Sequence, residues 1–367
     1  MSAIQDIFTS YGSDYLEHFG HSLPREHRKV IDAIRNCRTA HYGLSVYTCQ
    51  ACGKRHTTFR SCGNRHCPIC QNHKTRSWLE RQLDRQMPTH HFLITFTVPE
   101  GIRAFIRSHQ RICYEALFKA SSSALKTLAA NERFVGGDVP GFFGVLHTWG
   151  RQLIYHPHIH YVVPGGAYST RDRAWHASRK DFFVPVKALS AIFKARFKEE
   201  MEKAGIHNEI PAEVWRMPWN VNSQAVGRGE HATRYLAPYV FKVAISDSRI
   251  VSVAGGMVTF RYKKPGSERW RHMTLEAAEF IRRFLQHVLP TGFMKVRYYG
   301  FLHATATVKR TTVVLAIEIA SAFTVTVVRE VETLTAPRPV CPACGGTLVY
   351  CYSILPYMMM RLSMNSS

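Results

Sequence analysis

The sequence predicts an α+β protein in which a small N-terminal module precedes an antiparallel or mixed sheet with flanking helices. Three observations support this fold class. Segments with the apolar period of helices are interspersed with β-branched segments, six cysteines are grouped between residues 37 and 70, and the chain has no internal repeat or low-complexity tract. With 367 residues, the chain is long enough for two domains.

Helices are predicted where apolar residues recur at helical spacing. Pro88 and Pro290 end two of these segments, because proline does not continue a helix. The predicted helices cover residues 24–37, 75–88, 102–130 (one or two helices), 187–205 and 276–290.

Strands are predicted at residues 90–99, 141–150 and 158–166, where β-branched residues are frequent. A short connection joins the last two, so we expect them to form an antiparallel hairpin, and residues 250–264 look like another hairpin. The apolar segment 312–328 is interrupted by Glu318, which indicates core or hairpin and not a membrane span.

The charge of the chain favours a polyanion as its partner. Lys and Arg number 48 and Asp and Glu 26, a formal net charge of +22. The N-terminal MSAIQDIFTS has no basic patch followed by an apolar region, so no secretory signal is expected. In a reducing, cytosolic compartment, ten cysteines indicate metal binding more than disulfides.

Two CxxC pairs in the first fifth of the chain predict a structural zinc site. Each CxxC turn directs two thiolates to one point, and two such turns complete a tetrahedral site with no open position for a substrate. The predicted ligands are Cys49, Cys52, Cys67 and Cys70. Cys37, Cys62 and His66 could hold a second ion, with His56 or His73 as the fourth ligand.

Another cysteine pair, Cys341 and Cys344, has the form of a zinc knuckle, and Cys351 follows shortly after. The sequence shows no partner knuckle for it, so it is not assigned to a metal. Basic residues surround the N-terminal cysteines and suit phosphate contact, although a solvated basic face explains them equally. They are Lys54, Arg55, Arg60, Arg65, Lys74 and Arg76.

The stretch HPHIHYVV, residues 156–163, predicts a second kind of metal site. Residues at i and i+2 of a strand point to the same side, so His158 and His160 are neighbours on one face. If the preceding strand pairs antiparallel with this one, His147 comes alongside them, with His156 or Gln152 as substitutes. Three imidazoles with open positions would form a catalytic metal site. The plain alternative is a half-buried histidine beside a solvated one.

Tyr235 and Tyr239 are candidate nucleophiles, because residues at i and i+4 of a helix project from nearly the same face. A tyrosine that attacks a phosphodiester keeps the bond energy in a phosphotyrosine, so strand transfer can follow without ATP. Arg234 and Lys242 flank the pair and could contact DNA. Such pairs are most often core packing, and Pro238 between them is awkward inside a helix.

Together, these motifs resemble the paired-tyrosine rolling-circle transposases of the insertion sequence ninety-one family, within the HUH endonuclease superfamily. The resemblance rests on the CxxC pair, SCGNRHCPIC, HPHIHYVVPGG, YLAPYVFKVAISDSRI and RRFLQHVLPTGFMKVRYYGFL, and runs from about Cys37 to about Leu302. It implies an antiparallel HUH sheet with the histidine strand near its centre. Pro238 departs from the family pattern, in which arginine is common at that position.

The resemblance also implies roles for the motifs. The zinc module would bind DNA, His158 and His160 would hold a divalent ion (Mg²⁺ or Mn²⁺), and the tyrosines would form 5′-phosphotyrosine links to single-stranded or hairpin DNA ends of the element. The expected location is the bacterial cytoplasm, at the nucleoid. The expected domains are residues 1–89 (zinc-binding, DNA recognition), 90–305 (HUH transposase) and 306–367 (uncertain, with a possible zinc knuckle).

Two other classes of function remain open. A replication initiator or relaxase shares the HUH chemistry, although the zinc module and the YLAPYVFKVAIS context favour the transposase. A non-catalytic zinc DNA-binding regulator would explain the charge and the cysteines but not the histidines and tyrosines.

Overall fold

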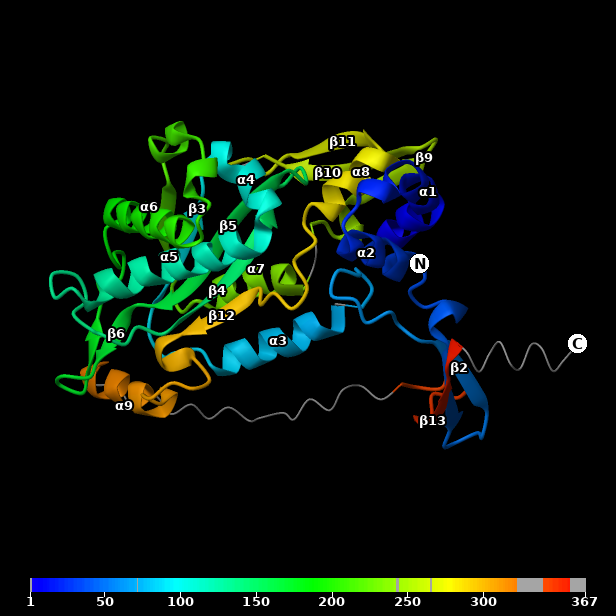
Figure 1. The fold of residues 1–367 in the computed structure, drawn as a ribbon. Helices are drawn as coiled ribbons and strands as arrows, with labels where there is room; N and C mark the ends of the chain where they lie inside the picture. The colour runs from blue at the N-terminus through cyan, green and yellow to red at the C-terminus, as the bar shows by residue number, and fades with distance from the viewer. Residues whose placement is uncertain (1, 71, 242–243, 265, 322–338, 357–367) are drawn as a thin grey trace, which may run out of the picture.

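The computed structural model describes residues 2–70, 72–241, 244–264, 266–321 and 339–356 (Figure 1). It confirms the α+β class and the antiparallel sheet. Lys242 lies outside the described residues, as does the part of the predicted segment 312–328 that follows residue 321.

A five-stranded antiparallel sheet forms the centre of the fold, in the order β12-β4-β5-β3-β8. The histidine-bearing strand β5 is the middle strand, as the resemblance implies. The predicted hairpin is confirmed, because β4 and β5 are antiparallel neighbours. The strands are β3 (His91–Thr97), β4 (Phe142–Trp149), β5 (Tyr155–Pro164), β8 (Asn220–Ala225) and β12 (Val296–Tyr299).

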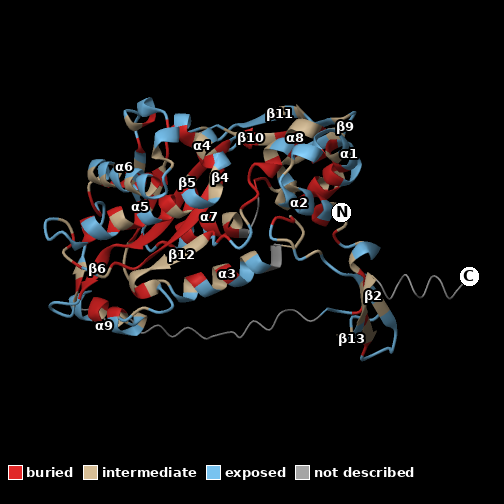
Figure 2. Ribbon diagram, viewed as in Figure 1, coloured by how far each residue is buried: buried red, intermediate tan, exposed pale blue. Residues whose placement is uncertain are grey.

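Helices cover both faces of this sheet, which explains why β3, β4 and β5 are mostly buried, whereas the edge strands β8 and β12 are more exposed (Figure 2). On one face, α5 (Gln110–Ala130) and α6 (Val186–Lys203) pack against residues such as Phe96 and Ile159. On the other face, α3 (Asn72–Asp84) and α7 (Glu230–Phe241) pack against Val145 and Val162. Because side chains alternate along a strand, the two faces carry different sets of residues.

The N-terminal helices belong to a second core. Helices α1 (Ala3–Phe19) and α2 (Arg25–Arg35) pack with α8 (Ala277–Leu285) and with a three-stranded sheet of order β11-β10-β9. The strands of that sheet are β9 (Ile250–Ala254), β10 (Met257–Lys263) and β11 (Trp270–Glu276). The beginning of the chain therefore shares apolar packing with residues about 250 positions later, and the domain boundaries at residues 89 and 305 stay a prediction.

A small sheet joins the beginning of the chain to its C-terminal part. Strand β1 (Leu44–Cys49) lies between β2 (Arg55–Phe59) and β13 (Leu348–Ile354), and both pairings are antiparallel (Figure 1). The pairing of β1 with β13 brings the C-terminal cysteines to the N-terminal ones.

The remaining described elements lie mostly at the edges of the two cores. Helix α4 (Arg103–Ser108) precedes α5, so the predicted segment 102–130 is two helices. A short hairpin, β6 (Gly166–Ser169) and β7 (Ala174–Ala177), packs with α9 (Arg310–Ser321). The described part of the segment 312–328 is this helix, so hairpin was the wrong interpretation there. No helix among the described residues has the length and apolarity that a membrane crossing requires.

Candidate active site and metal centres

Strands β4 and β5 bring three histidines together on the face of the sheet that α7 covers. His147 lies directly opposite His158, and Val145 opposite His160. Because His158 and His160 are two residues apart, all three imidazoles point to the same side. One ring nitrogen from each lies within 4.8 Å of the others. The observed register of the hairpin thus places His147, and not its two substitutes, beside His158 and His160.

The ring nitrogens of these histidines fit a divalent ion. His158 Nδ1 lies 2.6 Å from the carbonyl oxygen of His156, and His160 Nδ1 lies 2.8 Å from the hydroxyl of Thr95. An Nδ1–H that donates to a carbonyl leaves Nε2 with a free lone pair, the form that binds metal. His147 Nε2 is buried and has no hydrogen-bond partner among the described residues. A buried nitrogen with no partner is costly unless a ligand occupies the site.

Burial keeps the three imidazoles neutral. Burial, and next the neighbouring His156, lower the pKa of His160 to about 4. The pKa values of His147 and His158 are also well below the usual range, because of burial first and the adjoining imidazoles second. Metal binding requires the neutral form, so no proton has to be displaced at neutral pH.

Helix α7 carries the two tyrosines to the histidine cluster. The ring of Tyr239 lies 4.6 Å from that of His147, and the ring of Tyr235 lies 6.3 Å from that of His160, centroid to centroid. The two phenol rings are 5.2 Å apart. Pro238 lies inside the helix, and this does not hold Tyr239 away from the histidines. The structure therefore brings the predicted nucleophiles and the predicted ligands to one place.

The two phenols differ in their surroundings. The side chain of Tyr235 is 50% exposed, whereas Tyr239 is partly buried and packs against His147 and Trp149. Burial, and next the neighbouring Tyr235, raise the pKa of Tyr239 well above its ordinary value. At the same pH, less of Tyr239 is ionised than of an ordinary tyrosine.

Lys295 is a residue of the candidate site that the sequence reasoning missed. Its buried Nζ donates to the carbonyl oxygen of Tyr239 at 2.7 Å and lies 4.6 Å from the ring centroid of Trp149. Burial, and next the charge of Arg65, lower the pKa of Lys295 to about 7. A lysine directly before a strand gives no sequence signal for this contact, because the contact depends on β12 pairing with β4.

The two substitutes named for His147 lie outside the three-histidine cluster. The backbone carbonyl of His156 accepts from His158, and its side chain is not among the grouped ligands. Gln152 lies in the turn between the strands, where its backbone carbonyl accepts from Arg283 at 3.2 Å.

The cysteines form two groups of four, and this corrects the predicted division of the ligands between a first and a possible second site. Cys67 and Cys70 do not share a site with Cys49 and Cys52. The first group is Cys37, Cys62, Cys67 and Cys70, and the second is Cys49, Cys52, Cys341 and Cys344; in each, the sulfur atoms lie within 4.8 Å of one another. The prediction paired the CxxC turns that are nearest in sequence, whereas the β1–β13 pairing supplies a more distant partner.

The histidines suggested as zinc ligands are not members of these groups. His66 is buried, and its Nε2 accepts from the backbone N–H of Leu289 at 3.1 Å, so it joins the zinc module to the segment after α8. His56 Nε2 lies 3.2 Å from Cys341 Sγ and contacts the second group from outside. The side chain of His73 is not among those described.

The local chemistry of the cysteines suits metal. Hydrogen bonding from the backbone N–H of Cys52 lowers the pKa of Cys49 to about 6, and hydrogen bonding with Cys62 lowers the pKa of Cys67 to about 6, whereas burial raises the pKa of Cys37. Thiolates are the form that binds zinc, and backbone N–H groups stabilise their charge. A group of four thiolates leaves no position for substrate, so these are structural centres.

The basic residues predicted to contact DNA have mixed surroundings. Arg65 donates to the carbonyl of Phe293 at 2.8 Å. Lys74 and Arg234 are exposed, and Arg76 pairs with Glu80 at 3.0 Å on the surface of α3. Arg65 therefore has a structural contact, while the other three lie at the surface, where a ligand can reach them.

Two family models match parts of this chain. Residues 141–310 match a family model described as "Putative transposase", and residues 7–98 match one described as "Transposase zinc-binding domain". The fold, the zinc module and these matches define the chain as a transposase.

Two relatives show to which family the chain belongs. A protein of Sinorhizobium fredii (strain NBRC 101917 / NGR234) named "Putative transposase y4qJ" is 40% identical over 319 residues, which are 82% of this chain and 80% of the relative. The "Transposase for insertion sequence element IS801" of Pseudomonas savastanoi pv. phaseolicola is 26% identical over 75% of this chain and 70% of its own length. The chain belongs to the transposases of the insertion sequence ninety-one family. No solved structure matches it.

Proposed function

We propose that this transposase nicks single-stranded or hairpin DNA at the ends of its element through a 5′-phosphotyrosine intermediate and then rejoins the strand, in a rolling-circle mode. One observation carries the proposal. Two phenols on one helix lie beside three imidazoles whose ring nitrogens are within 4.8 Å of one another. A DNA substrate also accounts for the net charge of +22, and places the work of the protein in the bacterial cytoplasm, at the nucleoid.

His147, His158 and His160 would hold the catalytic divalent ion, Mg²⁺ or Mn²⁺. The donor set favours Mn²⁺ of the two, because Mg²⁺ prefers oxygen ligands whereas imidazole suits transition metals. When bound, the ion supplies positive charge to the scissile phosphate.

The residues of the chain make and break the bonds. The exposed Tyr235 has the freer approach to a phosphate. Its phenol oxygen attacks phosphorus, the bond from phosphorus to the 3′-oxygen breaks, and the phenol proton is finally carried by the 3′-hydroxyl that leaves. A phosphotyrosine on the 5′ side remains, and a free 3′-hydroxyl reverses the step to rejoin DNA. Tyr239 serves the second strand, and Lys295 fixes the backbone of that tyrosine through its carbonyl.

The two four-cysteine groups would each hold one structural zinc ion. A zinc-binding N-terminal module is a property of the family model that matches residues 7–98, and the first group lies entirely within that range. The second group extends beyond it to Cys341 and Cys344. We therefore assign two ions to the chain.

An assay for a covalent adduct tests this function. The protein, with Mn²⁺ or Mg²⁺ and a single-stranded oligonucleotide that carries its element end, should give an adduct stable in denaturing gels and a product with a free 3′-hydroxyl. A double variant, Tyr235→Phe with Tyr239→Phe, should give none. An adduct from the double variant would remove the tyrosine assignment, and no adduct from the wild type would favour the non-catalytic regulator.

A further inference from the structure

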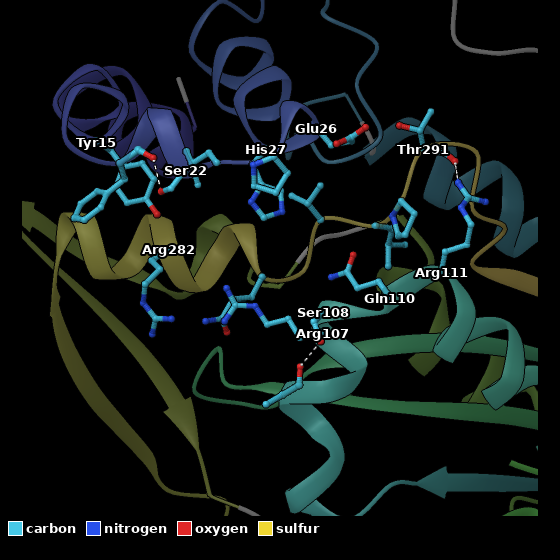
Figure 3. A pocket seen from close by; sticks show the side chains of 18 residues that line it. Tyr15, Ser22, Glu26, His27, Arg107, Ser108, Gln110, Arg111, Arg282 and Thr291 are labelled. Carbon is cyan, nitrogen blue, oxygen red and sulfur yellow. Dashed lines mark hydrogen bonds between the residues drawn. The ribbon is translucent and has the colours of Figure 1, made fainter. Parts of the chain in front are cut away.

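A large cleft lies between the N-terminal helices and the catalytic unit. A cavity of about 980 Å³ is enclosed by α1, α2, the α4–α5 junction and α8, with the labelled side chains directed toward it from these elements (Figure 3). A second cavity of about 280 Å³ shares Arg107, Arg282 and Gln286 with the first and extends to Tyr155. The two cavities therefore lie next to each other, and together we call them the arginine cleft.

The lining of the arginine cleft is strongly positive. Glu26 is the one carboxylate among the lining residues, whereas five guanidinium groups line the two cavities. These groups belong to Arg103, Arg107, Arg111, Arg282 and Arg283.

Two of the five guanidinium groups lack an anionic partner. Arg282 and Arg283 are hydrogen-bonded to Glu279, and Arg103 lies 3.6 Å from the exposed Glu100. Arg107 and Arg111 have no carboxylate oxygen within 4 Å in the part of the chain that the structure describes. Both residues are exposed, so their charges are available to an anion from outside the chain.

Neutral groups hold these two arginines at the cleft wall. The side-chain oxygen of Gln286, oriented toward the guanidinium groups, accepts from Arg107 at 3.1 Å, and the backbone carbonyl of Thr291 accepts from Arg111. These hydrogen bonds hold Arg107 and Arg111 in position, and because both acceptors are neutral, the positive charges of the two guanidinium groups are not neutralised. Guanidinium groups suit phosphate, because the fork of N–H donors matches the oxygens of that anion.

An aromatic pair lies at the same cleft. Tyr15 and Phe19 are one turn apart on α1, both line the larger cavity, and their rings are 5.0 Å apart. Phe19 is 46% exposed, so part of its ring is open to a ligand. An exposed ring beside guanidinium groups is the pattern that binds single strands, where the ring stacks on a base and the cations meet phosphates.

We propose that the arginine cleft binds a single-stranded segment of DNA, with phosphates on Arg107 and Arg111 and a base stacked on Phe19. The proposal rests on the proposed function and adds a binding site for the substrate strand. In a duplex, the faces of the bases are already stacked on one another, so the aromatic position favours a single strand. Tyr155, which lines the smaller cavity, begins β5, and His158 follows three residues later, roughly 10 Å along the strand but on the opposite face of the sheet. The cleft therefore lies near the end of the histidine-bearing strand and is separate from the histidine cluster.

Equilibrium binding of the full-length protein to a fluorescein-labelled 20-nucleotide oligothymidine tests the arginines. The double variant Arg107→Gln with Arg111→Gln should bind at least about 10-fold more weakly, and its log–log salt slope should be shallower by about 1.4, or roughly 0.7 for each phosphate that an arginine no longer neutralises. The matched control is Arg133→Gln with Arg171→Gln, two exposed arginines that do not line the cleft. Equal affinity and slope in the double variant and the wild type would overturn the proposal.

The same assay tests the stacking and the choice of a single strand. Phe19→Ala should weaken oligothymidine binding about 5-fold or more, whereas Phe182→Ala, an exposed aromatic outside the cleft, should not. Binding of a 20-base-pair duplex should change less than about 2-fold in the Phe19 and double-arginine variants. An equal loss for duplex and single strand would make the cleft a duplex site and contradict the proposal.

A measurement on the wild type avoids any doubt about folding of the variants. Oligothymidine that contains 4-thiothymidine should photo-crosslink to peptides of residues 3–19 or 103–111, and crosslinks found only elsewhere would overturn the proposal. Oligothymidine lacks an element end and needs no nucleophile. If the cleft does not bind DNA, the wild type should still form the covalent adduct with its element end. If the tyrosines are not nucleophiles, the wild type should still bind oligothymidine through the cleft.

Discussion

The sulfur atoms of Cys49 and Cys344 lie 3.5 Å apart, although 295 positions separate them in the chain. This contact makes the second zinc centre a link between the beginning of the chain and its C-terminal part. We expect two zinc ions per wild-type chain and one in Cys344→Ser, measured by elemental analysis in reducing buffer. Losing one thiolate from a four-thiolate site removes much of the metal affinity.

The second zinc centre also predicts that the effects of Cys49→Ser and Cys344→Ser on zinc content are not additive. Cys49→Ser should lose the same ion as Cys344→Ser, so the double variant should still retain one zinc. Cys351→Ser is the matched control, because Cys351 lies on β13 but outside the group, and it should retain two ions. Two zinc ions in Cys344→Ser would show that this cysteine is no ligand.

The histidine cluster predicts a separation of cleavage from binding. The double variant His158→Ala with His160→Ala should lose adduct formation at least about 100-fold, because the ion site loses two of its three imidazoles. Affinity for the uncleaved oligonucleotide should stay within about 2-fold, since these neutral groups add little to phosphate contact. His156→Ala, whose side chain lies outside the cluster, is the control, and equal cleavage by both variants would argue against the metal site.

The unequal environments of the phenols predict unequal rates. Tyr235 is more exposed, and Tyr239 has the raised pKa. In a single-cleavage assay, Tyr235→Phe should therefore slow adduct formation at least about 10-fold, whereas Tyr239→Phe should change it little. Both variants should fail in complete transposition if the tyrosines act in alternation. If Tyr239→Phe slowed adduct formation in the single-cleavage assay more than Tyr235→Phe did, Tyr239 and not Tyr235 would be the main nucleophile in that step.

Lys295 predicts a pH dependence of stability. Its pKa is lowered to about 7 in the folded protein, against about 10.4 in an unfolded chain. Between these values the unfolded state binds more protons, so the free energy of unfolding contributed by this residue rises with pH from about 7 to about 10. Lys295→Met should lack this rise, which denaturation at several pH values would measure as the difference between the two proteins. If the free energy of unfolding of the wild type and of Lys295→Met changed with pH in the same way, Lys295 would be in contact with solvent, and its pKa would not be lowered.

The same substitution tests the role of the lysine in holding Tyr239. Methionine fills similar space without an N–H donor, and it removes a buried charge, so the fold should be retained at neutral pH. Adduct formation through Tyr239, measured in the Tyr235→Phe background, should fall in Lys295→Met. Adduct formation through Tyr235 should fall less, because Lys295 contacts the Tyr239 carbonyl.

Part of the grouping of the histidines and tyrosines could be predicted from the sequence, because local rules determine it. The i, i+2 spacing puts His158 and His160 on one face. The register that adds His147 could not be fixed from the sequence, because a register shift lies between His147 and Trp149. The helical spacing of Tyr235 and Tyr239 holds without any knowledge of the rest of the fold. The sequence did not predict which face of the sheet would receive that helix, since this depends on packing against Val145 and Val162.

The errors of prediction lie where distant segments meet. The cysteine grouping failed because the β1–β13 pairing joins segments about 300 residues apart, and local spacing carries no signal for it. Residues 310–321 contain many β-branched residues but form helix α9, because Val313 and Ile317 recur at helical spacing and are buried in the core with Phe301. Tertiary packing there overrides a weak local preference.

The pairing of β13 with β1 also determines the order in which the two zinc centres can form during translation. Leu348 lies opposite Cys49 in the finished sheet, yet it leaves the ribosome about 300 residues later. At 5–20 residues per second, that interval is roughly 15 to 60 s. Until then, Cys49 and Cys52 have only each other as protein sulfurs for a shared ion, while the four sulfurs of the Cys37 group are complete once residue 70 has emerged. The first zinc centre can therefore close early in translation, and the second can close only after the histidines and tyrosines have already been made.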